Sequence, residues 1–512
     1  MAEPEPAPGI SKGIRLAPED APSSLRAAAS RSVVWTAIGK GANTVVSLLV
    51  TAVLTRLLTP ADFGIIAMVV VLSGFLNIVA EAGLSTAVVQ KRNLEQRALS
   101  SLFWFGLGVG AVTTALMALA APLAALFFSE PRLTPVVALM SLGFVAISLG
   151  RVPNGLLERS FKFREIALAE VVAALVGGVV GITGALLDFG YFALVLQTLT
   201  TAFLNAILRL LLSRFRPSRA LDLHEVRAVS GYSGGVVAFA AINYWARNLD
   251  KALIGRFLGA ASLGFYGRAY QLMLYPLEAI NGILNPTLHP VLSSLQLDRP
   301  RMARTYCKLA KLVAVLALPA MGILGALAPE VVRTIWGPQW EPSIRVFSIL
   351  CFVGSVQPVG ATFGAVFLAT NRTRSLALLG LVNAVVIMVG IAAGVPYGIE
   401  GVAIGYSVAY GLIFLPTMYI VVVRLLGGKV RDMVAVLGPA MLMAAVVLAV
   451  LLLYNGVMRE RWGDLPHLLF GIAIGVATWL GTFVVVDRSL LAEAVSLARP
   501  RQRAPNSDSS VG

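Results

Sequence analysis

"NTVVSLLVTAVLTRLLTPADFG", residues 43–64, sets the class of the fold. Apolar residues dominate it up to Arg56, and Thr59-Pro60 then ends the run. A helix needs about 20 mainly apolar residues to cross the hydrocarbon core of a bilayer. Comparable runs recur from residue 33 to residue 486, and 13% of the 512 residues are charged, against about 25% in a soluble chain. The sequence therefore predicts an all-α polytopic membrane protein.

We predict about 14 transmembrane helices, at residues 33–57, 62–90, 99–128, 133–150, 166–187, 190–213, 229–257, 262–291, 306–327, 343–369, 375–393, 399–423, 433–454 and 467–486. With both termini cytoplasmic, the loops predicted outside hold only four basic residues, namely Arg132, Arg333, Arg459 and Arg461. Lys and Arg concentrate in cytoplasmic loops of membrane proteins. This charge asymmetry favours an even number of helices with the N- and C-termini cytoplasmic.

Residues 43–64 align without a gap on residues 243–264, which lie 200 positions later in the chain. The identical pairs are Asn43/Asn243, Leu49/Leu249, Ala52/Ala252, Arg56/Arg256, Leu58/Leu258, Ala61/Ala261 and Gly64/Gly264. Six predicted helices separate the two copies, so both cross the membrane in the same direction, as in transporters built from parallel repeats. We expect two six-helix lobes that rock around a central cavity by alternating access.

The predicted organisation follows from this repeat. It comprises a disordered cytoplasmic tail (1–30), an N-lobe (31–212), a cytoplasmic linker (213–227), a C-lobe (228–424), two further helices (425–487) and a second cytoplasmic tail (488–512).

The second copy carries four charged residues, Arg247, Asp250, Lys251 and Arg256, inside a predicted membrane helix. A charge at the bilayer centre costs about 2.5–3.5 kcal/mol on insertion scales. Arg247 and Lys251 are four residues apart and share one helix face. The first copy has a polar stripe along one face, formed by Lys40, Thr44, Ser47, Thr51 and Thr55. We expect both faces to line the cavity.

Basic residues outnumber acidic ones in the predicted helices, so the cavity should attract an anion. The candidate substrate-binding residues are Lys40, Arg247, Lys251, Arg268 and Asn243. A second interpretation remains open, in which Arg247, Asp250 and Lys251 neutralise one another and only lock helices together.

The acidic residues Glu81, Asp250 and Glu278 are candidates for ion pairs or for coupling to a proton or cation gradient. Arg56 and Arg256 lie at helix ends, which suits a gating or structural role as well as substrate contact. No metal site or cofactor is expected. No nucleic-acid partner is expected either, because the basic residues behind the net charge of +15 are scattered over short loops. Such loops contact anionic membrane lipids.

Two segments resemble a known family. "LTRLLTPADFGIIAMVVVLSGFLNIVAEAGLSTAVVQ" (54–90) and "NLDKALIGRFLGAASLGFYGRAYQLMLYPLEAINGILNPTLHPVLSSLQLD" (248–298) are similar to the polysaccharide-transporter branch of the multidrug, oligosaccharidyl-lipid and polysaccharide exporter superfamily. The resemblance implies a flippase that moves an undecaprenyl-diphosphate-linked oligosaccharide across the bacterial cytoplasmic (inner) membrane, for export of exopolysaccharide, lipopolysaccharide or capsule-type glycans. It makes a glycan polymerase and glycosyltransferases candidate partners.

Two alternatives belong to other functional classes. A drug or organic-cation antiporter of the same superfamily would need an acidic cavity, which the basic surplus disfavours. A membrane enzyme such as a glycan polymerase would need a large polar catalytic loop or a carboxylate cluster for metal. The longest predicted outside stretch, "APEVVRTIWGPQWEP" (328–342), has two Glu and no Asp or His. We therefore do not expect an enzyme.

Overall fold

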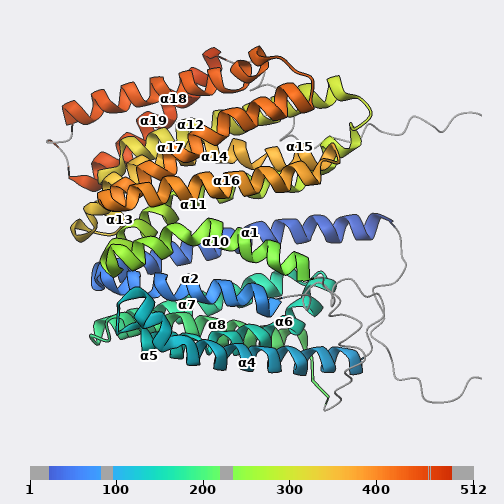
Figure 1. The fold of residues 1–512 in the computed structure, drawn as a ribbon, viewed down its shortest axis with the longest axis vertical. Helices are drawn as coiled ribbons and strands as arrows, with labels where there is room; N and C mark the ends of the chain where they lie inside the picture. The colour runs from blue at the N-terminus through green and yellow to red at the C-terminus, as the bar shows by residue number, and fades with distance from the viewer. Residues whose placement is uncertain (1–21, 82–95, 219–233, 459–460, 462, 487–512) are drawn as a thin grey trace, which may run out of the picture. The chain divides into compact units, whose positions relative to one another are not determined.

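The computed structural model describes residues 22–81, 96–218, 234–458, 461 and 463–486. All regular secondary structure in these residues is helical, which confirms the predicted all-α class (Figure 1). The described residues include 11 stretches long and apolar enough to cross a membrane, and one of these, Thr373–Leu425, contains two of the predicted helices. The chain is thus a polytopic membrane protein. The number 14 stays a prediction, because the helices at 234–257 and 259–294 are not among the 11.

The chain divides into two compact units. Unit 1 comprises Met1–Gly267, Ile335–Trp340 and Val395–Val402, and unit 2 comprises Arg268–Thr334, Glu341–Gly394 and Ala403–Gly512. This division falls at Gly267 and not at the predicted linker 213–227, part of which lies outside the described residues. Compact units and sequence repeats are different divisions of a chain, so the predicted lobe boundaries stay predictions.

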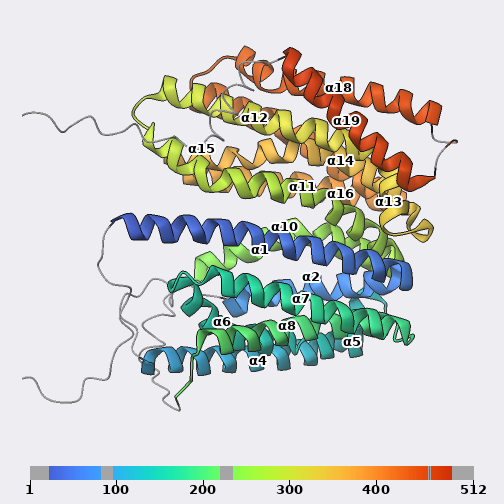
Figure 2. The ribbon, with the colours of Figure 1, turned by 180° about the vertical axis from the view of Figure 1, so that it is seen from behind.

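Unit 1 contains α1 (Pro22–Leu57), α2 (Pro60–Glu81), α4 (Gln96–Phe128), α5 (Leu133–Met140), α6 (Gly143–Arg159), α7 (Phe163–Leu186), α8 (Tyr191–Ser213), α10 (Gly234–Phe257) and the short helices η1 (Pro338–Trp340) and η2 (Val395–Tyr397). The first helix begins inside the range predicted for the N-terminal tail. From behind, α1 is seen to run along α7 (Figure 2). A Cβ on Gly178 of α7 would lie 2.4 Å from Val50 of α1, so this small residue lets the two helices pack closely.

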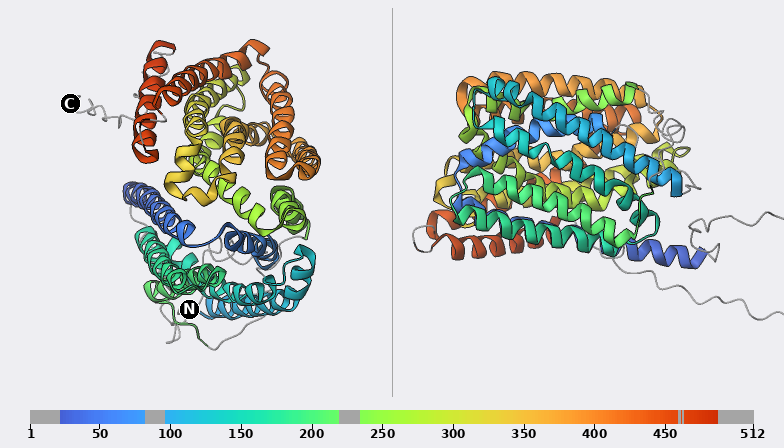
Figure 3. Two further views of the ribbon diagram at one scale, coloured as in Figure 1. Left: turned by 90° about the vertical axis from the view of Figure 1, so that its left-hand side faces the viewer. Right: turned by 90° about the horizontal axis from the view of Figure 1, so that it is seen from below.

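Unit 2 contains most of α11 (Gly259–Ser294), α12 (Arg299–Ala326), α13 (Ala328–Ile335), α14 (Pro342–Ala361), α15 (Phe363–Ala369), α16 (Thr373–Gly394), α17 (Gly398–Tyr419), the π-helix η3 (Ile420–Leu425), α18 (Val430–Met458) and α19 (Asp464–Val486). Its core centres on α12, which packs against α14, α18 and α19. Figure 3 (left) looks along the helices of each unit and shows them close to end-on.

The start of α2 shows how the sequence sets a helix boundary. Pro60 occupies the first helical position, where its missing N–H costs nothing. The Thr59 backbone N–H donates to Asp62 Oδ2 at 2.9 Å, and the Asp62 N–H donates back to Thr59 Oγ1 at 3.4 Å. This reciprocal pair is a capping box that fixes where α2 begins. At the equivalent position in the second copy, Gly259 begins α11 with φ +84°, a conformation that favours glycine.

Two repeat-related glycines lie at the closest approach between α2 and α11. A Cβ on Gly64 would lie 1.7 Å from the carbonyl oxygen of Ala260, and a Cβ on Gly264 would lie 1.9 Å from the carbonyl oxygen of Pro60. The contact is reciprocal, since Pro60 and Ala260, like Gly64 and Gly264, are 200 positions apart. A local two-fold axis between the helix starts would produce this pattern. The contact involves residues that the 200-residue shift pairs, and the repeat itself stays a prediction.

Candidate functional site

The polar face of α10 in unit 1 centres on Lys251. Its ammonium Nζ donates to Asn248 Oδ1 at 3.2 Å, and Asn248 Nδ2 donates to the Tyr244 carbonyl at 3.0 Å. Tyr244 in turn donates its hydroxyl to the Val71 carbonyl of α2 at 2.7 Å. Tyr244, Asn248 and Lys251 share one side of the helix, because each residue advances by about 100°. The sequence pattern identified Lys251 but missed both neutral neighbours, which carry no charge to draw attention.

Asp250 lies on another side of α10 and is buried, with 4% of its surface exposed. One carboxylate oxygen accepts a hydrogen bond from the Tyr266 hydroxyl at 3.1 Å, and the other accepts from the Lys251 backbone N–H at 2.8 Å. Tyr266 belongs to the first turns of α11 and is itself fully buried. The structure therefore separates Asp250 from the more exposed face that carries Lys251.

Three of the predicted site residues have no described side chain. Asn243 and Arg247 lie in α10, and Glu81 ends α2, but their side chains fall outside the described part of the chain. Their predicted roles in substrate binding and coupling stay predictions.

The polar face of α11 in unit 2 begins at Arg268. Its guanidinium Nη1 donates to Gln271 Oε1 at 2.8 Å, and Gln271 Nε2 donates to the Tyr275 hydroxyl at 3.2 Å. Glu278 follows one turn later and is exposed. The sequence identified Arg268 and Glu278 as separate candidates. The structure links Arg268 through Gln271 to Tyr275, one turn before Glu278. The sequence did not identify Gln271 or Tyr275 as site residues.

The remaining basic candidates lie toward helix ends or on open faces. Lys40 is exposed on α1, and its carbonyl accepts a hydrogen bond from Thr44 Oγ1 at 2.9 Å. Arg256, the last basic residue of α10, donates to the Ser129 hydroxyl. Arg56 lies in the last turn of α1, and its Cγ would be 3.8 Å from a Cβ on Gly337. Arg56 and Arg256 thus contact other segments of the chain. Such contacts suit the predicted structural role of these two residues.

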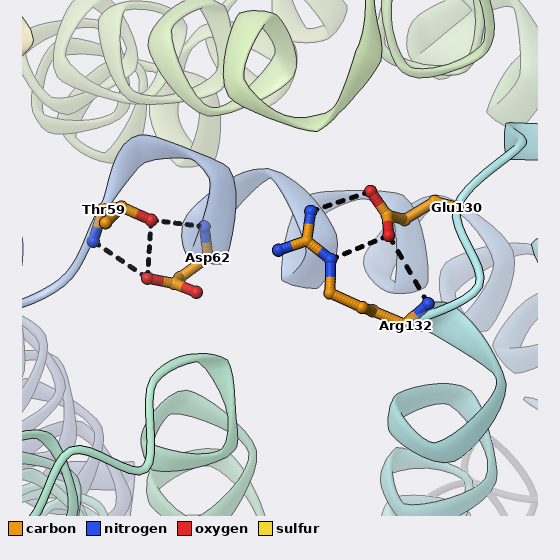
Figure 4. Close-up of polar contacts among 4 residues, drawn as sticks. All are labelled: Thr59, Asp62, Glu130 and Arg132. Atoms are coloured by element: carbon orange, nitrogen blue, oxygen red, sulfur yellow. Dashed lines mark hydrogen bonds and ion pairs between the residues drawn. The ribbon is translucent and has the colours of Figure 1, made fainter.

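The same end of unit 1 holds a charged turn after α4 (Figure 4). Arg132 forms a bidentate ion pair with Glu130, through Nε at 2.8 Å and Nη2 at 2.9 Å. The hydrogen bonds from Arg132 lower the pKa of the Glu130 carboxyl below its usual value. The same bonds raise the pKa of Arg132, and the nearby charge of Asp62 adds to that rise. The turn thus carries paired charges and supplies no surplus cation.

A six-residue segment from far along the chain, Ile335–Trp340, packs into this end of unit 1. Trp340 is fully buried, and its indole N–H donates to the Thr55 carbonyl at 2.9 Å. Gln339 Nε2 donates to the carbonyls of Thr55 and Leu58, the latter at 3.2 Å. The Trp340 ring contacts Phe63 and Phe265, with centroids 5.4 and 5.9 Å away. The segment therefore ties together the ends of α1, α2 and α11.

Thr55, the last residue of the predicted polar stripe on α1, is consequently buried beneath this segment. Lys40 and Thr44 of the same stripe are exposed. Within the described residues, no group of three or more His, Cys, Asp and Glu side chains could hold a metal ion.

Comparisons with known proteins agree with the resemblance inferred from the sequence. A family model described as "Polysaccharide biosynthesis protein" matches residues 53–345. The lipopolysaccharide biosynthesis protein WzxC of Escherichia coli (strain K12) is 25% identical over 355 residues, covering 68% of this chain and 71% of that protein. The succinoglycan biosynthesis transport protein ExoT of Rhizobium meliloti (strain 1021) is 26% identical over 496 residues, covering 92% of this chain and 96% of its own length.

Solved structures show the fold. The lipid II flippase MurJ, in an inward closed conformation, superposes with a TM-score of 0.70 at 14% identity, over 90% of this chain and 100% of that one. An inward-facing multidrug transporter of the MATE family superposes with a TM-score of 0.55 at 17% identity, over 74% of this chain and 94% of that one. At these identities the likeness concerns the fold alone.

Proposed function

The chain belongs to the family of polysaccharide biosynthesis proteins, and from that premise we propose that it is a flippase for a lipid-linked oligosaccharide. It moves an undecaprenyl-diphosphate-linked oligosaccharide across the bacterial cytoplasmic membrane by alternating access, with both termini cytoplasmic. It makes and breaks no covalent bond in the substrate. A glycan polymerase and glycosyltransferases act on the same glycan and are its proposed partners.

The observation that carries this proposal is the pair of cation-bearing polar faces on helices of a membrane protein. Lys251 is half-buried on α10, and Arg268 is half-buried on α11, each hydrogen-bonded to a neutral amide on its own helix. A lysine or arginine in a membrane helix is retained where it meets polar groups, because exposure to hydrocarbon is costly. A diphosphate offers many acceptor oxygens, and both side chains are donors only.

The substrate-binding residues of this proposal are Lys251 and Arg268, with Lys40, Asn243 and Arg247 as further members. For energetic coupling, Asp250 has the best support among Asp250, Glu81 and Glu278. Its carboxylate is buried and has a hydroxyl partner in Tyr266. A carboxylate in such a place can exchange a proton or cation as the surrounding helices rearrange. Arg56 and Arg256 hold helix ends in place.

The test removes the two α10 cations and measures transport. In inverted membrane vesicles, a labelled polyprenyl-diphosphate oligosaccharide is supplied from the exposed cytoplasmic face. We expect the double variant Arg247→Ala/Lys251→Ala to slow translocation at least tenfold, since a hydrogen bond to a charged group contributes about 1.5–3 kcal/mol and about 1.4 kcal/mol corresponds to a factor of ten.

The matched control is Arg372→Ala/Arg374→Ala, which removes two exposed arginines near the start of α16. It should translocate like the wild-type protein. Unchanged translocation in the α10 double variant would remove these residues from the mechanism. Protection of cells from cationic dyes, without any glycan translocation, would instead favour the antiporter.

A further inference from the structure

The polar face of α11 extends beyond its arginine. Arg268, Gln271, Tyr275 and Glu278 are spaced by three, four and three residues, which places all four within about 80° of the helix circumference. We call this set the α11 ladder. Its residues are half-buried or exposed, whereas Ala269, Met273 and Leu277 between them are buried. The ladder is therefore the outward face of α11 within unit 2.

The position of the ladder along α11 excludes lipid as its neighbour. With a rise of 1.5 Å per residue, Arg268 lies about 13 Å from the first residue of the helix, and Glu278 about 24 Å from the last. Both charges thus lie well inside a helix of 36 residues, which the sequence predicts to cross the membrane. Facing hydrocarbon would cost about 2.5–3.5 kcal/mol for each charge. The ladder must therefore meet water, a polar ligand or polar groups of the protein.

The hydrogen bonds within the ladder fix what it offers to a ligand. Gln271 accepts from Arg268 and donates to Tyr275, so its amide orientation is set. An amide carries two donors and two acceptor lone pairs, so one of each remains on Gln271. The Tyr275 oxygen accepts from Gln271, which leaves the hydroxyl proton available for an outside acceptor. Glu278 has no hydrogen bond or ion pair with the described residues, and its carboxylate only accepts.

This mixture of donors and acceptors suits hydroxyl groups and not phosphate. A phosphate oxygen only accepts hydrogen bonds, and the Glu278 carboxylate would repel it. A sugar hydroxyl both donates and accepts, and the C–H face of a sugar ring can pack on the phenol ring of Tyr275, since aromatic rings combine an apolar face with a polar handle. We propose that Gln271, Tyr275 and Glu278 form a sugar-recognition surface for the oligosaccharide part of the substrate, with Arg268 at the diphosphate end.

This inference rests on the proposed function, and the test separates the two. Full-length protein in lipid nanodiscs is titrated with two probes. One is undecaprenyl diphosphate without sugar. The other is the undecaprenyl-diphosphate-linked oligosaccharide extracted from the strain that produces the protein. We expect the double variant Gln271→Leu/Tyr275→Phe to bind the glycan-bearing lipid about tenfold more weakly, as expected for two lost hydrogen bonds, and undecaprenyl diphosphate within about twofold of wild type.

Tyr270→Phe is the matched control, because it removes a hydroxyl from the same helix. Tyr270 is about 200° from Arg268 around α11, and its ring contacts Tyr406 at 6.1 Å. It should bind both probes like the wild-type protein.

Two results would overturn the inference and leave the proposed function standing. One is an equal loss of affinity for both probes, which would place the ladder at the diphosphate or in folding. The other is no loss for either probe. If the pH dependence of transport changed in that second case, the ladder would be a proton path. Failure of the wild-type protein to bind either probe would instead refute the proposed function.

Discussion

Arg132 and Glu130 show how a single turn is held at the end of unit 1. The guanidinium meets both carboxylate oxygens, and this fork-to-fork geometry makes the pair stronger than a single contact. Arg132 remains partly open to solvent, with 46% of its side chain exposed, against 16% for Glu130. Exposed pairs of this kind contribute about 0.2–1 kcal/mol. The turn between α4 and α5 should therefore gain modest, pH-dependent stability.

The direction of that pH dependence follows from the carboxyl group. Because its pKa is lowered in the folded protein, the stabilisation is fully present above the unfolded pKa, about 4.3 for Glu. It is lost as the pH falls through the lower folded pKa. We expect Glu130→Gln to lower the thermal midpoint of the detergent-solubilised protein slightly at pH 7. This difference from the wild-type protein should be smaller at a pH below the unfolded pKa of about 4.3 than at pH 7.

Asp188→Asn is a suitable control, since Asp188 is exposed in a turn and its φ of +60° is one that Asn also tolerates. Its thermal midpoint should follow that of the wild-type protein at both pH values. A Glu130→Gln difference that grew on acidification would contradict the assigned direction of the pKa shift.

Sequence alone revealed the charged members of the site and little of its neutral part. A Lys or Arg within an apolar run is conspicuous, so Lys251 and Arg268 could be predicted. Asn248, Gln271 and Tyr275 are neutral, and only the three-dimensional hydrogen bonds connect them to the charges. Asp250 was predicted from the same charged stretch, but its burial against Tyr266, 16 positions away, depends on tertiary packing.

At the scale of the elements, the contact between α2 and α11 is sensitive to side-chain size. Neither Gly64 nor Gly264 has room for a Cβ, and in each case the obstacle is backbone, which cannot rotate away. Gly267 lies one turn further along α11 and has no atom within 4 Å of its hypothetical Cβ. Gly264 and Gly267 therefore form a matched pair on α11, one without room for a side chain and one with room.

We expect Gly64→Ala and Gly264→Ala each to lower the thermal midpoint clearly. Overpacking of this kind costs about 1–3 kcal/mol. Gly267→Ala should be neutral or slightly stabilising, because Ala favours the helix over Gly by up to about 1 kcal/mol. Thermal unfolding of the purified protein in detergent compares the three. If Gly64→Ala and Gly264→Ala had the same thermal midpoint as Gly267→Ala, the described close approach of α2 and α11 would be contradicted.

The helices themselves were largely predictable, whereas the segment Ile335–Trp340 was not. Each predicted span overlaps a helix, because an apolar run of sufficient length has few alternatives in a membrane. The stretch 328–342 was treated only as a loop too small for catalysis. Its Trp340 and Gln339 bond to Thr55, more than 280 positions earlier in the chain. No periodicity in a single sequence encodes such a contact.

At the scale of the whole molecule, membership of the polysaccharide biosynthesis family and the polar faces within each unit point to the same kind of substrate. Unit 1 offers Lys251 on α10, and unit 2 offers the α11 ladder. A lipid-linked oligosaccharide combines an anionic diphosphate with a hydroxyl-rich glycan. A cationic drug would meet the positive charges of Lys251 and Arg268, which weighs against the antiporter.

The most direct test of the proposed translocation uses purified wild-type protein reconstituted into liposomes that contain a fluorescent undecaprenyl-diphosphate-linked oligosaccharide. A membrane-impermeant reagent added outside destroys only the fluorophores in the outer leaflet. We predict that the protein exposes the inner-leaflet fraction to the reagent, so that the protected signal falls well below that of protein-free liposomes. A protected fraction equal to that of protein-free liposomes, with or without an imposed proton or cation gradient, would contradict it.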